Sequence, residues 1–97
     1  MNRKQVLRIL KEHSAEIAGQ YGVKSLALFG SVARDQASPA SDVDLLVEFD
    51  RPVGLFGLFA LQEYLENLLG CPVDLGTPDS LKPHLREHVL SERVYVS

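Results

Sequence analysis

The chain has no tryptophan and a single cysteine, Cys71, so it can form neither an intramolecular disulfide nor a zinc site built from several cysteines. This scarcity is typical of a reducing compartment, and we expect a cytoplasmic protein. The formal net charge is −3, so the basic excess of nucleic-acid-binding domains is absent. No apolar run approaches about 18 residues, so we expect no membrane span. Charged residues interrupt the N-terminal segment, so we expect no signal peptide either.

With 97 residues, the chain has the length of one small domain, and we expect residues 1–97 to form a single unit. Apolar periodicity and turn residues predict helices at about 3–21, 32–35, 55–69 and from 79 or 80 to 91. The same signals predict strands at 25–29, 43–49, 72–75 and 93–96, with a loop over 37–41. This alternation favours an α/β or α+β fold, in which helices flank a small mixed β-sheet.

The first predicted strand ends in Gly30-Ser31, directly before the short predicted helix. Glycine lets the backbone approach a ligand closely, serine offers a hydroxyl donor, and the N-terminus of a helix attracts anions. These features suit a phosphate group. The same dipeptide would also make an ordinary strand-to-helix turn with a serine cap, so both interpretations stay open.

Two carboxylates, Asp42 and Asp44, stand at the start of the second strand, and ten residues separate Ser31 from Asp42. Residues two apart in a strand point to the same face, and two close carboxylates repel each other unless a cation lies between them. Magnesium suits such a pair because it accepts carboxylate, water and phosphate oxygens. The alternative is a solvated start of a strand with no ligand.

A third acid, Asp74, lies between Val73 and Leu75 in the third short apolar strand. If that strand neighbours 43–49, the Asp74 carboxylate can reach the same cluster. Its role would then be general base for an incoming hydroxyl, with a share in metal binding. The alternative is an aspartate on an edge strand that faces water.

Together these residues resemble the signature of the minimal nucleotidyltransferases (MNT) of the DNA polymerase β superfamily, and the resemblance covers nearly the whole chain. That signature is Gly-Ser, about ten residues, then Asp-x-Asp, and a third acid follows later in the chain. Asp35 departs from the pattern, since many relatives carry glycine there. The matching positions are Gly30, Ser31, Arg34, Ser41, Asp42, Asp44 and Asp74.

The resemblance implies a nucleotidyltransferase core and transfer of AMP from ATP with the help of two Mg²⁺ ions. It implies that Asp42, Asp44 and Asp74 hold the metals, with Asp74 also helping to deprotonate the acceptor. Gly30 and Ser31 would hold the β- and γ-phosphates, and Arg34 would add positive charge beside them, unless it is an ordinary surface arginine.

A small chain of this family resembles the antitoxin of HEPN/MNT toxin–antitoxin pairs, which implies AMP transfer to a tyrosine of a HEPN ribonuclease toxin. Two alternatives remain: a non-catalytic antitoxin that neutralises the toxin by binding, and a small-molecule (aminoglycoside-type) nucleotidyltransferase completed by a second subunit. The predicted helix 55–69 is apolar over a wide arc, so it is either buried in the monomer or docked against another chain. Homo- and hetero-oligomers are therefore both open.

Overall fold

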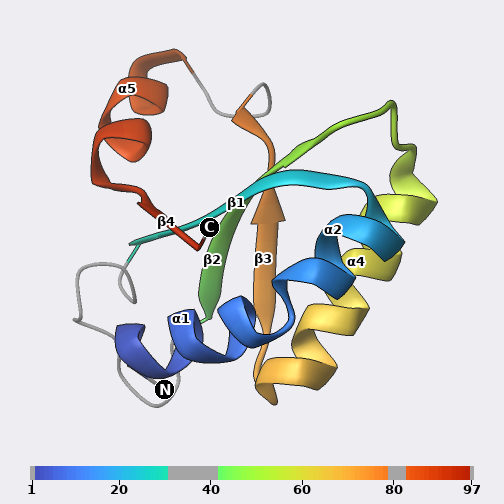
Figure 1. Ribbon diagram of the computed structural model, residues 1–97. Coiled ribbons are helices and arrows are strands. Elements are labelled where there is room, and N and C mark those ends of the chain that lie inside the picture. Colours follow the sequence, from blue (N-terminus) through green and yellow to red (C-terminus); the bar gives the residue numbers. More distant parts are fainter. Residues whose placement is uncertain (1, 31–41, 79–82, 97) are drawn as a thin grey trace.

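The computed structural model of the chain describes residues 2–30, 42–78 and 83–96 (Figure 1). The predicted helix 32–35, the loop 37–41 and the predicted start of the last helix at 79 or 80 lie outside these residues. The elements in chain order are α1 (Arg3–Glu12), α2 (Ser14–Tyr21), β1 (Val23–Phe29), β2 (Val43–Phe49), α4 (Leu55–Leu69), β3 (Val73–Gly76), α5 (Pro83–Glu92) and β4 (Val94–Tyr95).

The four described strands form one mixed sheet in the order β3-β2-β1-β4. β1 runs antiparallel to both β2 and β4, whereas β2 and β3 run parallel. The parallel pair is possible because α4 carries the chain back between β2 and β3, the crossover that parallel strands require. The predicted mixed sheet flanked by helices is confirmed.

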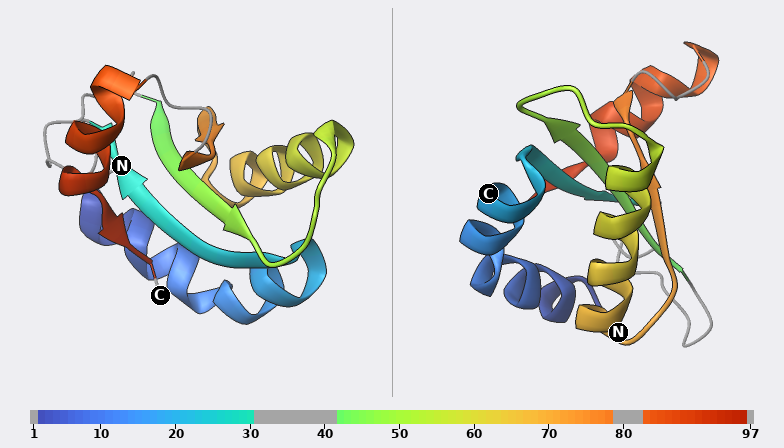
Figure 2. Two further views of the ribbon diagram at one scale, coloured as in Figure 1. Left: turned by 90° about the horizontal axis from the view of Figure 1, so that it is seen from above. Right: turned by 90° about the vertical axis from the view of Figure 1, so that its right-hand side faces the viewer.

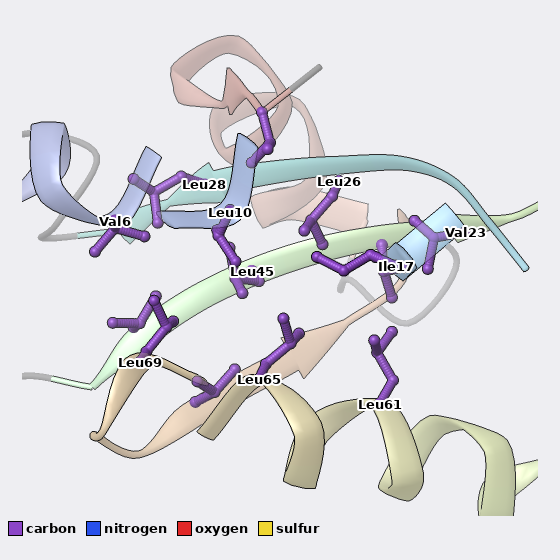
Figure 3. Packing of buried hydrophobic residues seen from close by; sticks show 14 residues of the cluster. Val6, Leu10, Ile17, Val23, Leu26, Leu28, Leu45, Leu61, Leu65 and Leu69 are labelled. Carbon is purple, nitrogen blue, oxygen red and sulfur yellow. The ribbon is translucent and has the colours of Figure 1, made fainter. Parts of the chain in front are cut away.

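Three helices, α1, α2 and α4, pack against one face of the sheet, while α5 is set apart from them at the upper left of Figure 1 (Figures 1 and 2). β2 shows why this face is apolar: Val43, Leu45 and Val47 are buried in the core, and alternation sends Asp44 and Glu48 to the opposite face. Figure 3 shows Leu61, Leu65 and Leu69 of α4 directed toward the strands. The second face of β2 therefore carries two acidic side chains, with the buried Leu46 between them.

The single helix predicted over residues 3–21 is wrong, because the chain turns at His13 and forms α1 and α2. Two side chains at this turn form contacts with backbone carbonyl groups in the last turn of α1. His13 Nδ1 lies 2.9 Å from the Ile9 carbonyl oxygen, and Ser14 Oγ donates to the Lys11 carbonyl at 2.9 Å. Such local side-chain bonds compete with helix continuation, and apolar periodicity does not report them.

The apolar helix α4 divides into two parts. Its C-terminal half is buried through Leu61, Leu65 and Leu69, but near its N-terminus Leu55, Phe56 and Phe59 are 67, 91 and 56% exposed. Burial in the monomer, one of the two interpretations of this helix, therefore holds for only part of it. No helix in the described ranges combines the length and the apolar character needed to cross a membrane.

Candidate functional site

The carboxylate of Asp44 lies against Gly30 at the end of β1. Phe29, the last residue of β1, pairs with Asp44 across the antiparallel ladder, which brings the next residue, Gly30, beside the Asp44 side chain. Gly30 has φ +74°, and a Cβ atom there would clash with Asp44 Oδ2. Glycine is thus favoured at this position for two reasons: the backbone has a positive φ, and the Asp44 carboxylate leaves no room for a Cβ atom. The sequence predicted close approach of a ligand at Gly30, and the structure places an acidic side chain there.

Asp44 and Asp74 are direct partners in the parallel ladder between β2 and β3. Neighbouring strands lie about 4.8 Å apart, and residues in register point to the same face. Asp44 is half-buried and Asp74 is exposed, both on the face opposite the apolar core. β2 and β3 are therefore neighbours in the sheet, which is the condition on which the predicted role of Asp74 depended.

Asp42 is exposed and lies one residue before β2. The start of β2 is tied to the turn before β3, because the Val43 amide donates to the Pro72 carbonyl at 3.1 Å. In the described part of the chain, no three His, Cys, Asp or Glu side chains form a metal-binding group. The structure thus brings Asp44 and Asp74 side by side but does not gather all three acids, and the three-carboxylate metal site stays a prediction.

The outer edge of β3 is held by two side chains of α4. Gln62 Nε2 donates to the Val73 carbonyl at 2.8 Å, and the Val73 amide donates to Glu66 Oε2 at 3.0 Å. Sequence reasoning missed both residues. The available signal was weak: Gln62 and Glu66 are four residues apart and so share one helix face, but Glu63 and Asn67 form a second such pair on α4.

Cys71 lies in the turn between α4 and β3, near the acids. Burial raises the pKa of its thiol, and the carboxylates of Asp42 and Glu66 act in the same direction. The neutral thiol is therefore favoured at this position, and the oxygen atoms of the acids are the anionic groups of the site.

A pocket of about 430 Å³ lies away from the acids, where β2 ends. It is lined by residues of β2, of the segment after β3 and of the region where α5 ends, among them Glu48, Thr77, Leu90 and Arg93, and by none of the three aspartates. The other two predicted nucleotide-binding residues, Ser31 and Arg34, lie outside the described residues.

Residues 3–96 match the family model of the nucleotidyltransferase domain. Protein adenylyltransferase MntA of Thermococcus cleftensis is 42% identical over 92 residues, which cover 95% of this chain and 93% of that protein. A solved structure provisionally described as a minimal nucleotidyltransferase has a TM-score of 0.81 at 38% identity, covering 97% of this chain and 95% of its own.

A chain in the structure of tri-AMPylated Shewanella oneidensis HEPN toxin in complex with MNT antitoxin has a TM-score of 0.67 at 17% identity. The match covers 94% of this chain and 71% of that one, and at this identity it indicates a shared fold alone.

Proposed function

Since this chain belongs to the nucleotidyltransferase domain family, we propose that it transfers AMP from ATP to a hydroxyl group of a partner protein. The name protein adenylyltransferase, carried by a relative that matches 95% of this chain, supports a protein acceptor. The acceptor we propose is a tyrosine of a HEPN toxin, which would make the chain an antitoxin. A structure of similar fold holds an AMPylated HEPN toxin with its MNT antitoxin, which supports this choice by analogy.

The observation that carries the proposal is the arrangement of Gly30, Asp44 and Asp74. Two carboxylates stand in register on adjacent strands, and one of them lies against the glycine that ends β1. Two carboxylates at neighbouring positions on one face of a sheet repel each other, and a cation bound between them would relieve that repulsion.

The donor atoms of this site suit magnesium, which prefers oxygen ligands and is bound by one or two carboxylates together with phosphate oxygens. Asp44 and Asp74 would hold the ions, and Asp42 would join them from its exposed position before β2. Bound Mg²⁺ would neutralise charge on the phosphates and on the attacking oxygen. Gly30, Ser31 and Arg34 would bind the β- and γ-phosphates.

In the proposed reaction the acceptor oxygen forms a bond to the α-phosphorus, and the bond from that phosphorus to the oxygen that bridges it to the β-phosphate breaks. The products are the AMP ester of the acceptor and pyrophosphate. Asp74 takes the proton of the acceptor hydroxyl, a role that its exposed side chain permits. Asp44, half-buried against Gly30, would hold a magnesium ion, because a carboxylate alone would repel the phosphates.

The test is transfer of radiolabel from ATP to the protein encoded by the neighbouring gene, in the presence of magnesium. Label in the α-phosphate should appear on the partner, whereas label in the γ-phosphate should not, because pyrophosphate leaves. Asp44→Asn should abolish the transfer while the protein stays folded, as measured by circular dichroism.

Two results would overturn the proposal. Transfer of γ-label would indicate phosphorylation instead of AMP transfer. A tight complex that neutralises the toxin with no label, and equally well with Asp44→Asn, would indicate an antitoxin that acts by binding alone.

A further inference from the structure

β3 is the edge strand beside β2, and it carries Asp74. The Pro72 carbonyl faces β2, because it accepts a hydrogen bond from the Val43 amide. Backbone groups of successive residues alternate between the two sides of a strand, so the amide and carbonyl of Val73 face the outer edge. An edge strand of four residues with free outer groups would be weakly held.

The outer groups of Val73 are not free, because α4 supplies a partner for each. The Val73 carbonyl accepts from Gln62 and the Val73 amide donates to Glu66, as a neighbouring strand would provide. The carbonyl oxygen can only accept, so the Gln62 atom that contacts it must be the amide nitrogen. Both side chains are half-buried, and α4 lies beside β3 in all three ribbon views (Figures 1 and 2).

The two bonds act one residue before Asp74. Because Val73 pairs with Val43, and Asp74 with Asp44, the position of Val73 along and across the sheet also sets the position of the Asp74 carboxylate. A tight turn limits the freedom of β3 further, since α4 ends at Leu69 and β3 begins at Val73.

We propose that Gln62 and Glu66 are positioning residues that hold Asp74 in register with Asp44 for transfer of the AMP group. This inference rests on the proposed function and adds two residues to the site that the nucleotidyltransferase signature does not contain. They act through their hydrogen bonds to the backbone of Val73.

The first test compares Glu66→Leu with Glu66→Gln in the AMP-transfer assay at saturating ATP. Leucine removes the acceptor, so β3 shifts, and kcat should fall about 10- to 100-fold with little change in the KM for ATP. Glutamine retains an acceptor oxygen and should restore most of the rate. The matched control is Glu63→Leu, an exposed acid on the same helix, which should leave kcat unchanged.

Gln62 is tested with the opposite chemistry, because it must donate. Gln62→Glu cannot donate and places a carboxylate oxygen against the Val73 carbonyl, so it should lower kcat as Glu66→Leu does. Loss of rate in Glu66→Leu together with retention in Glu66→Gln would distinguish the hydrogen bond from an effect of charge, because both variants remove the same negative charge and only glutamine keeps an acceptor.

A positioning role also predicts that the effect depends on Asp74. Adding Glu66→Leu to Asp74→Asn should cause no further fall in kcat, because the misplaced group is already disabled. A further tenfold fall in the double variant would refute the inference and indicate a purely structural role. The inference would also be refuted if Glu66→Leu speeds hydrogen exchange at the Val73 amide but leaves kcat at the wild-type value.

Failure of the proposed function would be distinguishable, since it would be visible in the wild-type protein as the absence of AMP transfer. Failure of the present inference is visible only in the variants. Hydrogen exchange at the Val73 amide, followed by NMR, reports the contact with Glu66 independently of any activity.

Discussion

Gly30→Ala should lower the rate of AMP transfer, because the added Cβ atom disturbs the Asp44 carboxylate. In this backbone conformation, with φ +74°, a residue with a Cβ costs about 1–2 kcal/mol. The added methyl group would also clash with Asp44 Oδ2, so the carboxylate must move. A displacement of about 1 Å in a reacting group can lower the rate about 100-fold, and we expect a loss of that order in AMP transfer.

The matched control is Gly70→Ala, because Gly70 has nearly the same φ of +72° but no atom lies within 4 Å of a Cβ built there. Gly70→Ala should lower the melting temperature through backbone strain alone, by about 4–8 °C for each kcal/mol lost in a domain of this size, and Gly30→Ala by at least as much. The two are compared by thermal unfolding and by AMP-transfer rate well below both melting temperatures. Equal transfer rates in the two variants would refute the argument that the Gly30–Asp44 contact matters for the reaction.

Three further predictions concern the fold and α4. Leu65→Ala, at a side chain that is 0% exposed, should lower the free energy of unfolding by about 2–5 kcal/mol in urea titrations. Phe56→Ser, at a side chain that is 91% exposed, should change it by no more than about 0.5 kcal/mol; a larger loss would mean that this part of α4 is covered in solution. The Tyr64 hydroxyl is buried, and burial, followed by the Glu16 carboxylate, raises its pKa. The folded protein therefore holds the Tyr64 proton more tightly than the unfolded protein does, and the wild type should lose stability as the pH rises above about 10. Tyr64→Phe should lose less stability over the same pH range. Parallel curves of unfolding free energy against pH for the two proteins would contradict this.

The elements with strong local signals were predicted well from the sequence. β2 and α4 begin and end where apolar runs and the breakers around them predict, at Val43–Phe49 and Leu55–Leu69. β1 begins at Val23, two residues before its predicted start, because pairing with Phe49 extends the strand. That extension comes from tertiary structure, which a single apolar run does not encode.

The candidate site was predictable where its residues carry a motif and not where they act through contacts. Asp44, Asp74 and Gly30 were identified from residue type and spacing, although the contact between Gly30 and the Asp44 carboxylate required the antiparallel register of β1 and β2. Gln62 and Glu66 were missed because their role depends on hydrogen bonds to Val73, 11 and 7 residues away in the chain. In the sequence they are ordinary polar positions on a helix.

The central claim is that carboxylates in register on β2 and β3 perform the transfer, and single-turnover AMP transfer by two variants tests it most directly. Glu48 provides the comparison, because it lies on the same strand and face as Asp44 but at the end that borders the pocket. We predict that Asp74→Asn lowers the single-turnover rate about 10²- to 10⁴-fold, while Glu48→Gln leaves it near the wild-type value. An unchanged rate in Asp74→Asn, or an equal loss in both variants, would contradict the account.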